Sequence, residues 1–152
     1  MTSPLSGVSA SGGPGCHGRI DRPLTNSELA DPALPPAVLV TVHDDAPPAV
    51  LREVCAGAEE QGIPTAILAP TTGAGADGLA RHAAGESRLE VGVGIGADGA
   101  VVVRHALVGE PVLRLPGGAP AGEVRQAGAD AARIVAGLPL WAAAQAVESA
   151  SA

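Results

Sequence analysis

Val54 to Pro64 reads V-C-A-G-A-E-E-Q-G-I-P and links the end of a predicted helix to the start of a predicted buried strand. Gly62 is typical of the residue that follows the last turn of a helix, because glycine adopts the left-handed conformation there at little cost. Glu59 and Glu60 stand in that last turn, where the helix dipole disfavours carboxylates. We therefore expect this acidic pair to serve something other than the local stability of the helix.

The segments on either side of this stretch predict a strand–helix–strand unit. Residues 37–43 (A-V-L-V-T-V-H) and residues 64–70 form apolar runs that are typical of strands buried on both faces. Between them, residues 48–61 carry a helical stripe of apolar side chains, with Asp45 as the expected N-cap. At about 100° per residue, Glu60 falls on the side of this helix away from the apolar stripe.

The second half of the chain completes a layered α/β pattern. Its predicted elements are a helix over 78–87, a strand over 89–95, an Asp-Gly hairpin, strands over 101–105 and 111–116, and a helix over 123–137. Gly92 and Gly94 share one face of their strand, which would allow a helix to approach closely. The pattern predicts a small Rossmann-like, three-layer α/β domain with a mixed, mostly parallel sheet.

Composition divides the chain into three parts. Residues 1–36 are rich in Ser, Gly and Pro and are expected to be a disordered extension, in which only residues 25–29 could form a turn of helix. Residues 37–141 make up the predicted α/β domain. Residues 142–152 form an Ala-rich tail.

Charge and composition exclude several classes of function. The 152 residues include no lysine, which excludes a P-loop lysine, a Schiff-base lysine and a pyridoxal phosphate site. The net charge of −7 disfavours nucleic acid or an anionic membrane as partner. With no signal-peptide pattern and no run approaching about 18 apolar residues, the sequence predicts a cytoplasmic protein.

The sequence contains no convincing catalytic set, and we expect a protein that is not an enzyme. His43 closes a predicted strand beside Asp44 and Asp45, where it could act as a base or ligand or be an ordinary polar group at a strand end. A small-molecule-binding module that uses His43 and the Gly-rich loop over 71–77 is one alternative. Glu60 could be a solvated charge or a single hard oxygen ligand, since one carboxylate is too few for a Mg²⁺ site of its own.

Three blocks of sequence, in this order and spacing, carry a family resemblance. They are A-E-E-Q-G-I-P at 58–64, S-R-L-E-V-G-V-G-I-G-A-D-G at 87–99, and Q-A-G-A-D-A-A-R-I-V-A-G-L-P-L at 126–140. Together they resemble the small (beta) subunit of glycerol/diol dehydratase reactivase, the reactivating factor for coenzyme B12-dependent dehydratases. The resemblance covers about residues 37–140. The chain departs from the family in its longer N-terminal extension and its lack of Phe and Tyr.

This resemblance implies a fold similar to the dehydratase medium subunit and a non-catalytic role in a chaperone-like, ATP-dependent factor. The implied partner is a large, actin-like ATPase subunit, commonly in an α2β2 heterotetramer, which binds the ATP. The factor releases damaged cobalamin from glycerol or propanediol dehydratase, so that adenosylcobalamin can replace it. In the family, the second Glu of E-E-Q-G reaches a divalent ion, Mg²⁺, at the subunit interface, and that position here is Glu60.

Two points stay open at this stage. The chain could instead be a structural medium or small subunit of the B12-dependent dehydratase itself, because the two small α/β folds are related. The resemblance also leaves open the diol substrate of the dehydratase and any association with a bacterial microcompartment.

Overall fold

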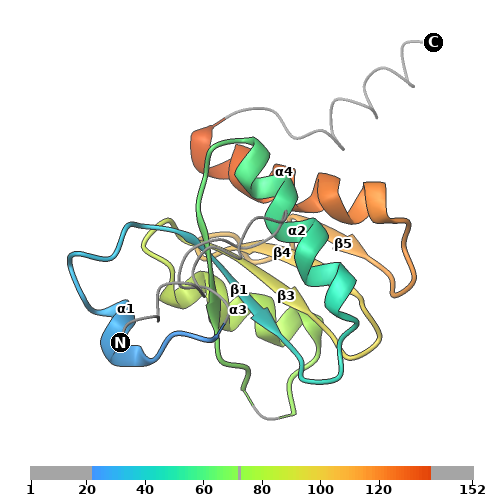
Figure 1. Cartoon of the computed structure of the whole chain (residues 1–152), viewed down its shortest axis with the longest axis horizontal. Helices are drawn as coiled ribbons and strands as arrows, with labels where there is room; N and C mark the ends of the chain where they lie inside the picture. Colours follow the sequence, from blue (N-terminus) through green and yellow to red (C-terminus); the bar gives the residue numbers. More distant parts are fainter. Residues whose placement is uncertain (1–21, 72, 138–152) are drawn as a thin grey trace, which may run out of the picture.

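Five strands form one mixed sheet in the computed structural model, which describes residues 22–71 and 73–137 (Figure 1). The strands are β1 (Val38–Val42), β2 (Thr65–Leu68), β3 (Val91–Ile95), β4 (Val101–His105) and β5 (Leu113–Leu115), in the order β2-β1-β3-β4-β5. β1 pairs in parallel with β2 and β3, and β4 pairs antiparallel with β3 and β5. The predicted mixed α/β sheet is confirmed, but the expectation that it is mostly parallel is wrong: β1 pairs in parallel with β2 and β3, whereas β3–β4 and β4–β5 are antiparallel, because the Asp-Gly hairpin and the short connection to β5 reverse the chain.

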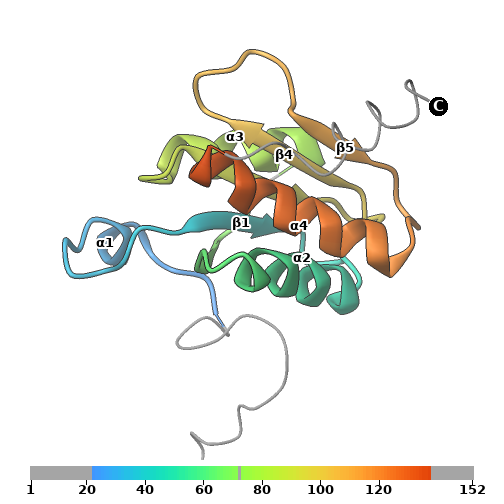
Figure 2. The same cartoon turned by 90° about the horizontal axis from the view of Figure 1, so that it is seen from above.

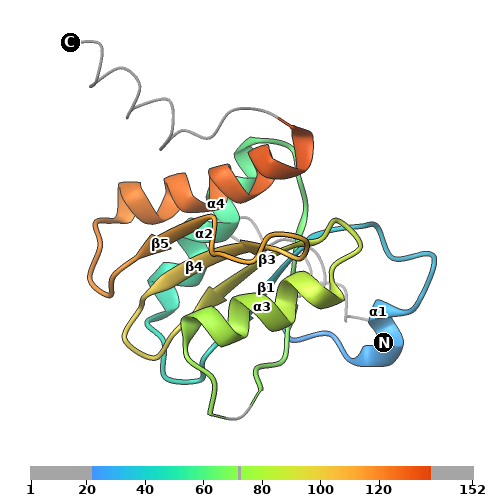
Figure 3. The same cartoon turned by 180° about the vertical axis from the view of Figure 1, so that it is seen from behind.

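The longer helices cover both faces of this sheet. The helices are α1 (Asn26–Leu29), α2 (Pro48–Glu60), α3 (Ala76–Glu86) and α4 (Ala121–Ala136). α2 and α4 lie side by side on one face, and α3 lies on the other (Figures 1 and 3). The predicted three-layer arrangement is therefore confirmed.

The start of α2 differs from the sequence expectation. Asp45 was the expected N-cap, but Pro47 occupies that position and Pro48 is the first helical residue. Two consecutive prolines fix the backbone φ angle and delay the helix start, because Pro suits the first turn and restricts the residue before it. The backbone N–H of Asp45 instead donates to Nδ1 of His43 at 3.0 Å.

The core consists of small aliphatic side chains on both faces of the sheet. On the face of α2 and α4, the fully buried members include Val38, Val40, Val54, Val91, Val93, Ile95, Val101 and Val103. On the other face, Gly92 and Gly94 let α3 approach the strand: a Cβ atom added to either glycine would lie 2.1 Å from a backbone atom of α3. The predicted close approach of a helix to these glycines is confirmed.

Part of the N-terminal extension packs against the domain. Residues 22–36 were expected to be disordered, yet Leu24 is buried and its N–H donates to the carbonyl of Ile67 at 2.7 Å, alongside the edge strand β2. Arg88, which follows α3, donates to the carbonyl of Asp31 at 2.6 Å. Figure 2 shows α1 and the chain around it beside the sheet, at the end of β1 where that strand begins. The composition argument failed here because a few leucines bury enough apolar surface to order this segment.

The predicted turn of helix within this segment is confirmed as α1. Thr25 caps it, and its side chain and that of Glu28 form a reciprocal capping box. The Arg22 side chain donates to Glu28, and this bond, with those from Thr25, lowers the pKa of Glu28 from 4.5 to about 2. Glu28 therefore favours the ordered segment while it is ionised.

We expect the stability of the ordered segment around α1 to depend on pH in the acidic range. Because the pKa of Glu28 is lowered on folding, its contribution is complete above about pH 4.5 and is lost as the pH falls through about 2. A carbon-detected NMR titration of the Glu28 carboxyl should give a midpoint near 2. Arg22→Gln should raise that midpoint. A midpoint that Arg22→Gln leaves unchanged would contradict the bond between these two side chains.

Three predicted parts of the chain lie outside the residues that the structure describes. Residues 1–21, the predicted domain end at 141 and the tail over 142–152 fall outside the described residues, so the assigned domain boundaries stay predictions. Within residues 22–71 and 73–137, no helix reaches the length and apolar character that a bilayer crossing needs.

Candidate functional site

The acidic pair stands at the end of α2, at the edge of the layer that α2 and α4 form. Glu60 is the last residue of α2, and Gly62 follows with φ +83°, as expected for a glycine stop. The side chain of Glu60 is 56% exposed, whereas Glu59 is partly buried. The predicted orientation of Glu60 away from the buried side of α2 is therefore confirmed.

Arg125 on α4 links two carboxylates of α2. Its Nε donates to Oε1 of Glu53 at 2.9 Å, and its Nη1 donates to Oε2 of Glu60 at 3.4 Å. Two turns further along α4, Nη1 of Arg133 donates to Oε1 of Gln61 at 3.3 Å. These contacts offset part of the unfavourable dipole interaction of a carboxylate at a helix C-terminus.

These cross-helix contacts depend on the close packing of α2 and α4. Gly57 on α2 lies against the backbone of Arg125, and Gly128 on α4 lies against the backbone of Val54. The partners of Arg125 were not predicted from the sequence. Glu53 and Gln61 stand eight residues apart, as Arg125 and Arg133 do, and this equal spacing on the two helices was the available signal.

Chemically, Glu60 suits the role of one ligand in a shared site. From the described residues its carboxylate accepts one bond, the long 3.4 Å bond from Arg125, which is weak at this exposure and could give way to a cation. Among the described residues, no group of three or more His, Cys, Asp or Glu side chains could hold a metal ion. Carboxylate oxygen is the donor that Mg²⁺ prefers, and most of its remaining ligands would have to come from elsewhere.

The alternative small-molecule site was expected to combine His43 with the Gly-rich loop over 71–77. Nδ1 of His43 accepts the backbone N–H of Asp45, which is the arrangement of an ordinary polar group at a strand end. Asp77, from the loop predicted to join His43, pairs instead with Arg104 on β4. The side chains of His43 and Asp77 are therefore each engaged by a partner other than the other.

The pair of Asp77 and Arg104 was missed by the sequence reading. Nε of Arg104 donates to Oδ1 of Asp77 at 2.6 Å, and Nη2 donates to Oδ2 at 3.2 Å. This hydrogen bonding is the main cause that lowers the pKa of Asp77 and raises that of Arg104. An arginine in an otherwise apolar β-run was the only signal in the sequence.

Comparison with known proteins now gives this geometry a context. A model of the family described as "Dehydratase medium subunit" matches residues 35–141. The probable glycerol dehydratase-reactivating factor small subunit of Citrobacter freundii is 37% identical over 92 residues, which cover 59% of this chain and 79% of that protein.

Two solved structures agree with that relationship. The glycerol dehydratase reactivase superimposes with a TM-score of 0.67 at 31% identity, over 70% of this chain and 96% of the matched chain. The diol dehydratase-reactivating factor, solved with ADP and Mg²⁺, gives a TM-score of 0.63 at 31% identity, over 70% of this chain and 98% of the matched one. Sequence and structure therefore agree: this chain belongs to the dehydratase medium-subunit family, as a member related to the small subunits of glycerol and diol dehydratase reactivases.

Proposed function

We propose that this chain is the non-catalytic small subunit of an ATP-dependent reactivating factor for a coenzyme B12-dependent glycerol or propanediol dehydratase. The observation that carries the proposal is the similarity to reactivase small subunits, which spans nearly the whole of the matched reactivase chains. In this proposal the large, actin-like partner subunit binds and hydrolyses ATP, and an α2β2 heterotetramer is the working assembly. The assembly loosens the inactivated dehydratase so that damaged cobalamin leaves and adenosylcobalamin enters.

The role of this chain is to offer a rigid docking surface. α2 and α4 meet through glycines at backbone contact, so their outer surface holds its shape when a partner binds. Glu60 lies exposed at the end of that surface, and the proposal assigns it to a Mg²⁺ ion shared with the large subunit. One structural relative was solved with ADP and Mg²⁺, which supports a role for the ion in such factors.

In such a shared site, this chain contributes one ligand, the carboxylate of Glu60. The Mg²⁺ ion would supply a positive charge that joins the two subunits. Arg125 holds Glu60 through a single bond in the free chain, and Glu53 holds Arg125 through a shorter one. Glu60 can therefore turn toward the ion while Arg125 stays on Glu53.

A binding experiment separates this function from that of a structural dehydratase subunit. The full chain, carrying an affinity tag, is co-expressed with the large reactivase subunit and, separately, with the catalytic subunit of the dehydratase. We expect a stable, stoichiometric complex with the large reactivase subunit in size-exclusion chromatography. A stable complex with the catalytic dehydratase subunit alone would contradict the proposal and favour the structural role.

A further inference from the structure

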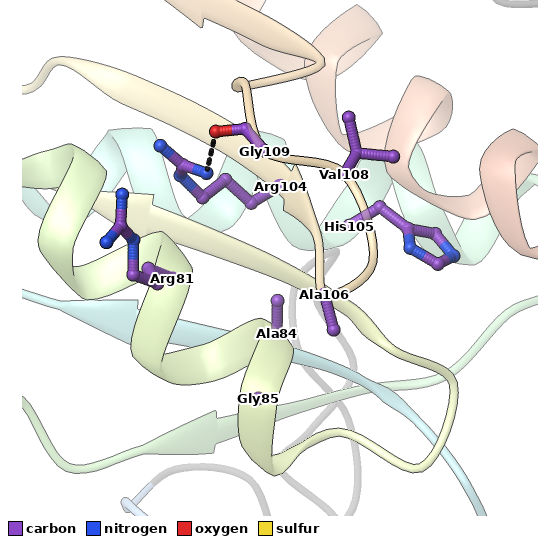
Figure 4. Close-up of a pocket in the computed structure, with 8 residues that line it drawn as sticks. All are labelled: Arg81, Ala84, Gly85, Arg104, His105, Ala106, Val108 and Gly109. Atoms are coloured by element: carbon purple, nitrogen blue, oxygen red, sulfur yellow. Dashed lines mark hydrogen bonds between the residues drawn. The ribbon is translucent and has the colours of Figure 1, made fainter.

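A pocket on the α3 face of the sheet is not used by the proposed function. Its volume is about 370 Å³, and it lies between α3 and the loop that follows β4 (Figure 4). Its lining residues are Arg81, Ala84, Gly85, Arg104, His105, Ala106, Val108 and Gly109. α3 covers the face of the sheet opposite to α2, so the pocket is separate from the site at Glu60.

A buried arginine forms one wall of this pocket. Arg104 is only 6% exposed, and its guanidinium donates two bonds to Asp77 and one, from Nη1, to the carbonyl of Gly109 at 3.2 Å. A guanidinium has five N–H groups, so these three bonds leave two donors available. The pair with Asp77 holds the guanidinium in a fixed orientation.

The residues that line the pocket include two arginines and no Asp or Glu. Arg81, on the pocket rim, has no hydrogen bond or ion pair with the described residues and is exposed. After the hydrogen bond from Arg104, the charges of Arg114 and Arg81 also lower the pKa of Asp77, so three guanidinium groups lie near one carboxylate. Glu110 is the other acidic group that acts on Arg104. Arg81 and Arg104 thus place two guanidinium groups in the pocket lining, in a chain whose net charge is −7.

The rim of the pocket also offers apolar surface. Val108, which lines the pocket, is 48% exposed, and its neighbour in sequence, Leu107, is 77% exposed; they are the exposed large apolar side chains in the described part of the chain. Nδ1 of His105 accepts the backbone N–H of Leu107 and fixes the start of this loop. Charged donors from Arg104 and Arg81, together with the apolar side chain of Val108, suit a small ligand with one anionic end.

We propose that this pocket binds the phosphate group of a small phosphorylated compound, with Arg104 and Arg81 as the contacting cations and Val108 at the apolar rim. Arginine fits phosphate oxygens through parallel N–H donors, and two guanidinium groups in one lining suit an anion of charge above one. The volume exceeds the need of a phosphate ion alone and leaves room for an attached organic group.

The test uses the full chain, labelled with ¹⁵N, and three probes: inorganic phosphate, phenyl phosphate and acetate. We expect saturable shifts of the Nε–H signal of Arg104 and of the amide signals of Ala106 and Gly109 with both phosphates, with tighter binding of phenyl phosphate. Arg81→Gln should weaken phosphate binding about fivefold, since it removes one charged contact from an exposed position. Arg52→Gln, which changes an exposed arginine on α2, is the matched control and should leave binding unchanged.

Several results would overturn the proposal. Shifts that never saturate at millimolar phosphate, or that Arg81→Gln and Arg52→Gln reduce equally, would indicate only general attraction to positive charge. Equal affinity for acetate and phosphate would overturn the assignment to phosphate. These probes are added to the isolated chain. A negative result would therefore overturn the phosphate site without affecting the proposed association with the large reactivase subunit, which is tested separately.

Discussion

Replacing Gly128 by alanine is expected to destabilise the protein by about 3 kcal/mol, although alanine is the better helix former by about 1 kcal/mol. A Cβ atom at this position of α4 would lie 2.0 Å from the carbonyl oxygen of Val54 on α2. That oxygen belongs to the backbone and cannot move without separating the two helices. Urea unfolding followed by circular dichroism measures the effect as a lower free energy of unfolding.

Gly122 is the matched control because it lies in the same helix. A Cβ atom there meets no heavy atom within 4 Å, so Gly122→Ala should leave the free energy of unfolding unchanged or raise it by up to about 1 kcal/mol. Equal effects of the two substitutions would contradict the close packing of α2 and α4. The docking surface assigned to these helices would then lose its structural basis.

Replacing Glu60 by alanine is expected to leave the isolated chain folded and to remove the Mg²⁺-dependent part of its affinity for the large subunit. Since the Glu60 side chain is 56% exposed and its one ion pair with the described residues, to Arg125, spans 3.4 Å, the loss of stability should stay below about 1 kcal/mol. Loss of a carboxylate ligand should weaken the association in Mg²⁺ by at least about tenfold. Titration calorimetry with and without Mg²⁺ separates the two contributions.

Glu86→Ala provides a matched control for this experiment. Glu86 is also an exposed glutamate at the last position of its helix, α3, on the opposite face of the sheet. Its replacement should change neither the affinity nor its dependence on Mg²⁺. If Glu60→Ala binds as tightly as the unmodified chain, with and without Mg²⁺, the metal role of Glu60 is wrong.

The elements of the fold could be predicted from the sequence because each has a local signal. The apolar run over 37–43, the glycine stop at Gly62 and the Asp-Gly hairpin at 98–99 identify their elements without knowledge of distant contacts. Gly92 and Gly94 even indicated that a helix would approach β3 closely. The order of segment 22–36 could not be predicted, because it depends on Leu24 meeting the edge of β2, which is a long-range contact.

The candidate site was predictable only in part. The exposure of Glu60 followed from helical geometry, whereas its contact with Arg125 depends on how α2 and α4 cross. The pair of Asp77 and Arg104 likewise joins residues 27 positions apart in sequence and needs the packing of α3 on β4. Such side-chain pairs depend on tertiary geometry, and periodicity within one element does not encode it.

The most direct test of the proposed function is the recovery of an inactivated dehydratase. The coenzyme B12-dependent dehydratase, inactivated by glycerol, is incubated with adenosylcobalamin, ATP, Mg²⁺ and the large reactivase subunit, in the presence or absence of this chain. We predict that dehydratase activity recovers when the chain is present and that recovery is lost or strongly reduced when it is omitted. Equal recovery with and without the chain, in a preparation where the two subunits form a complex, would contradict its assignment as a working subunit of the reactivating factor.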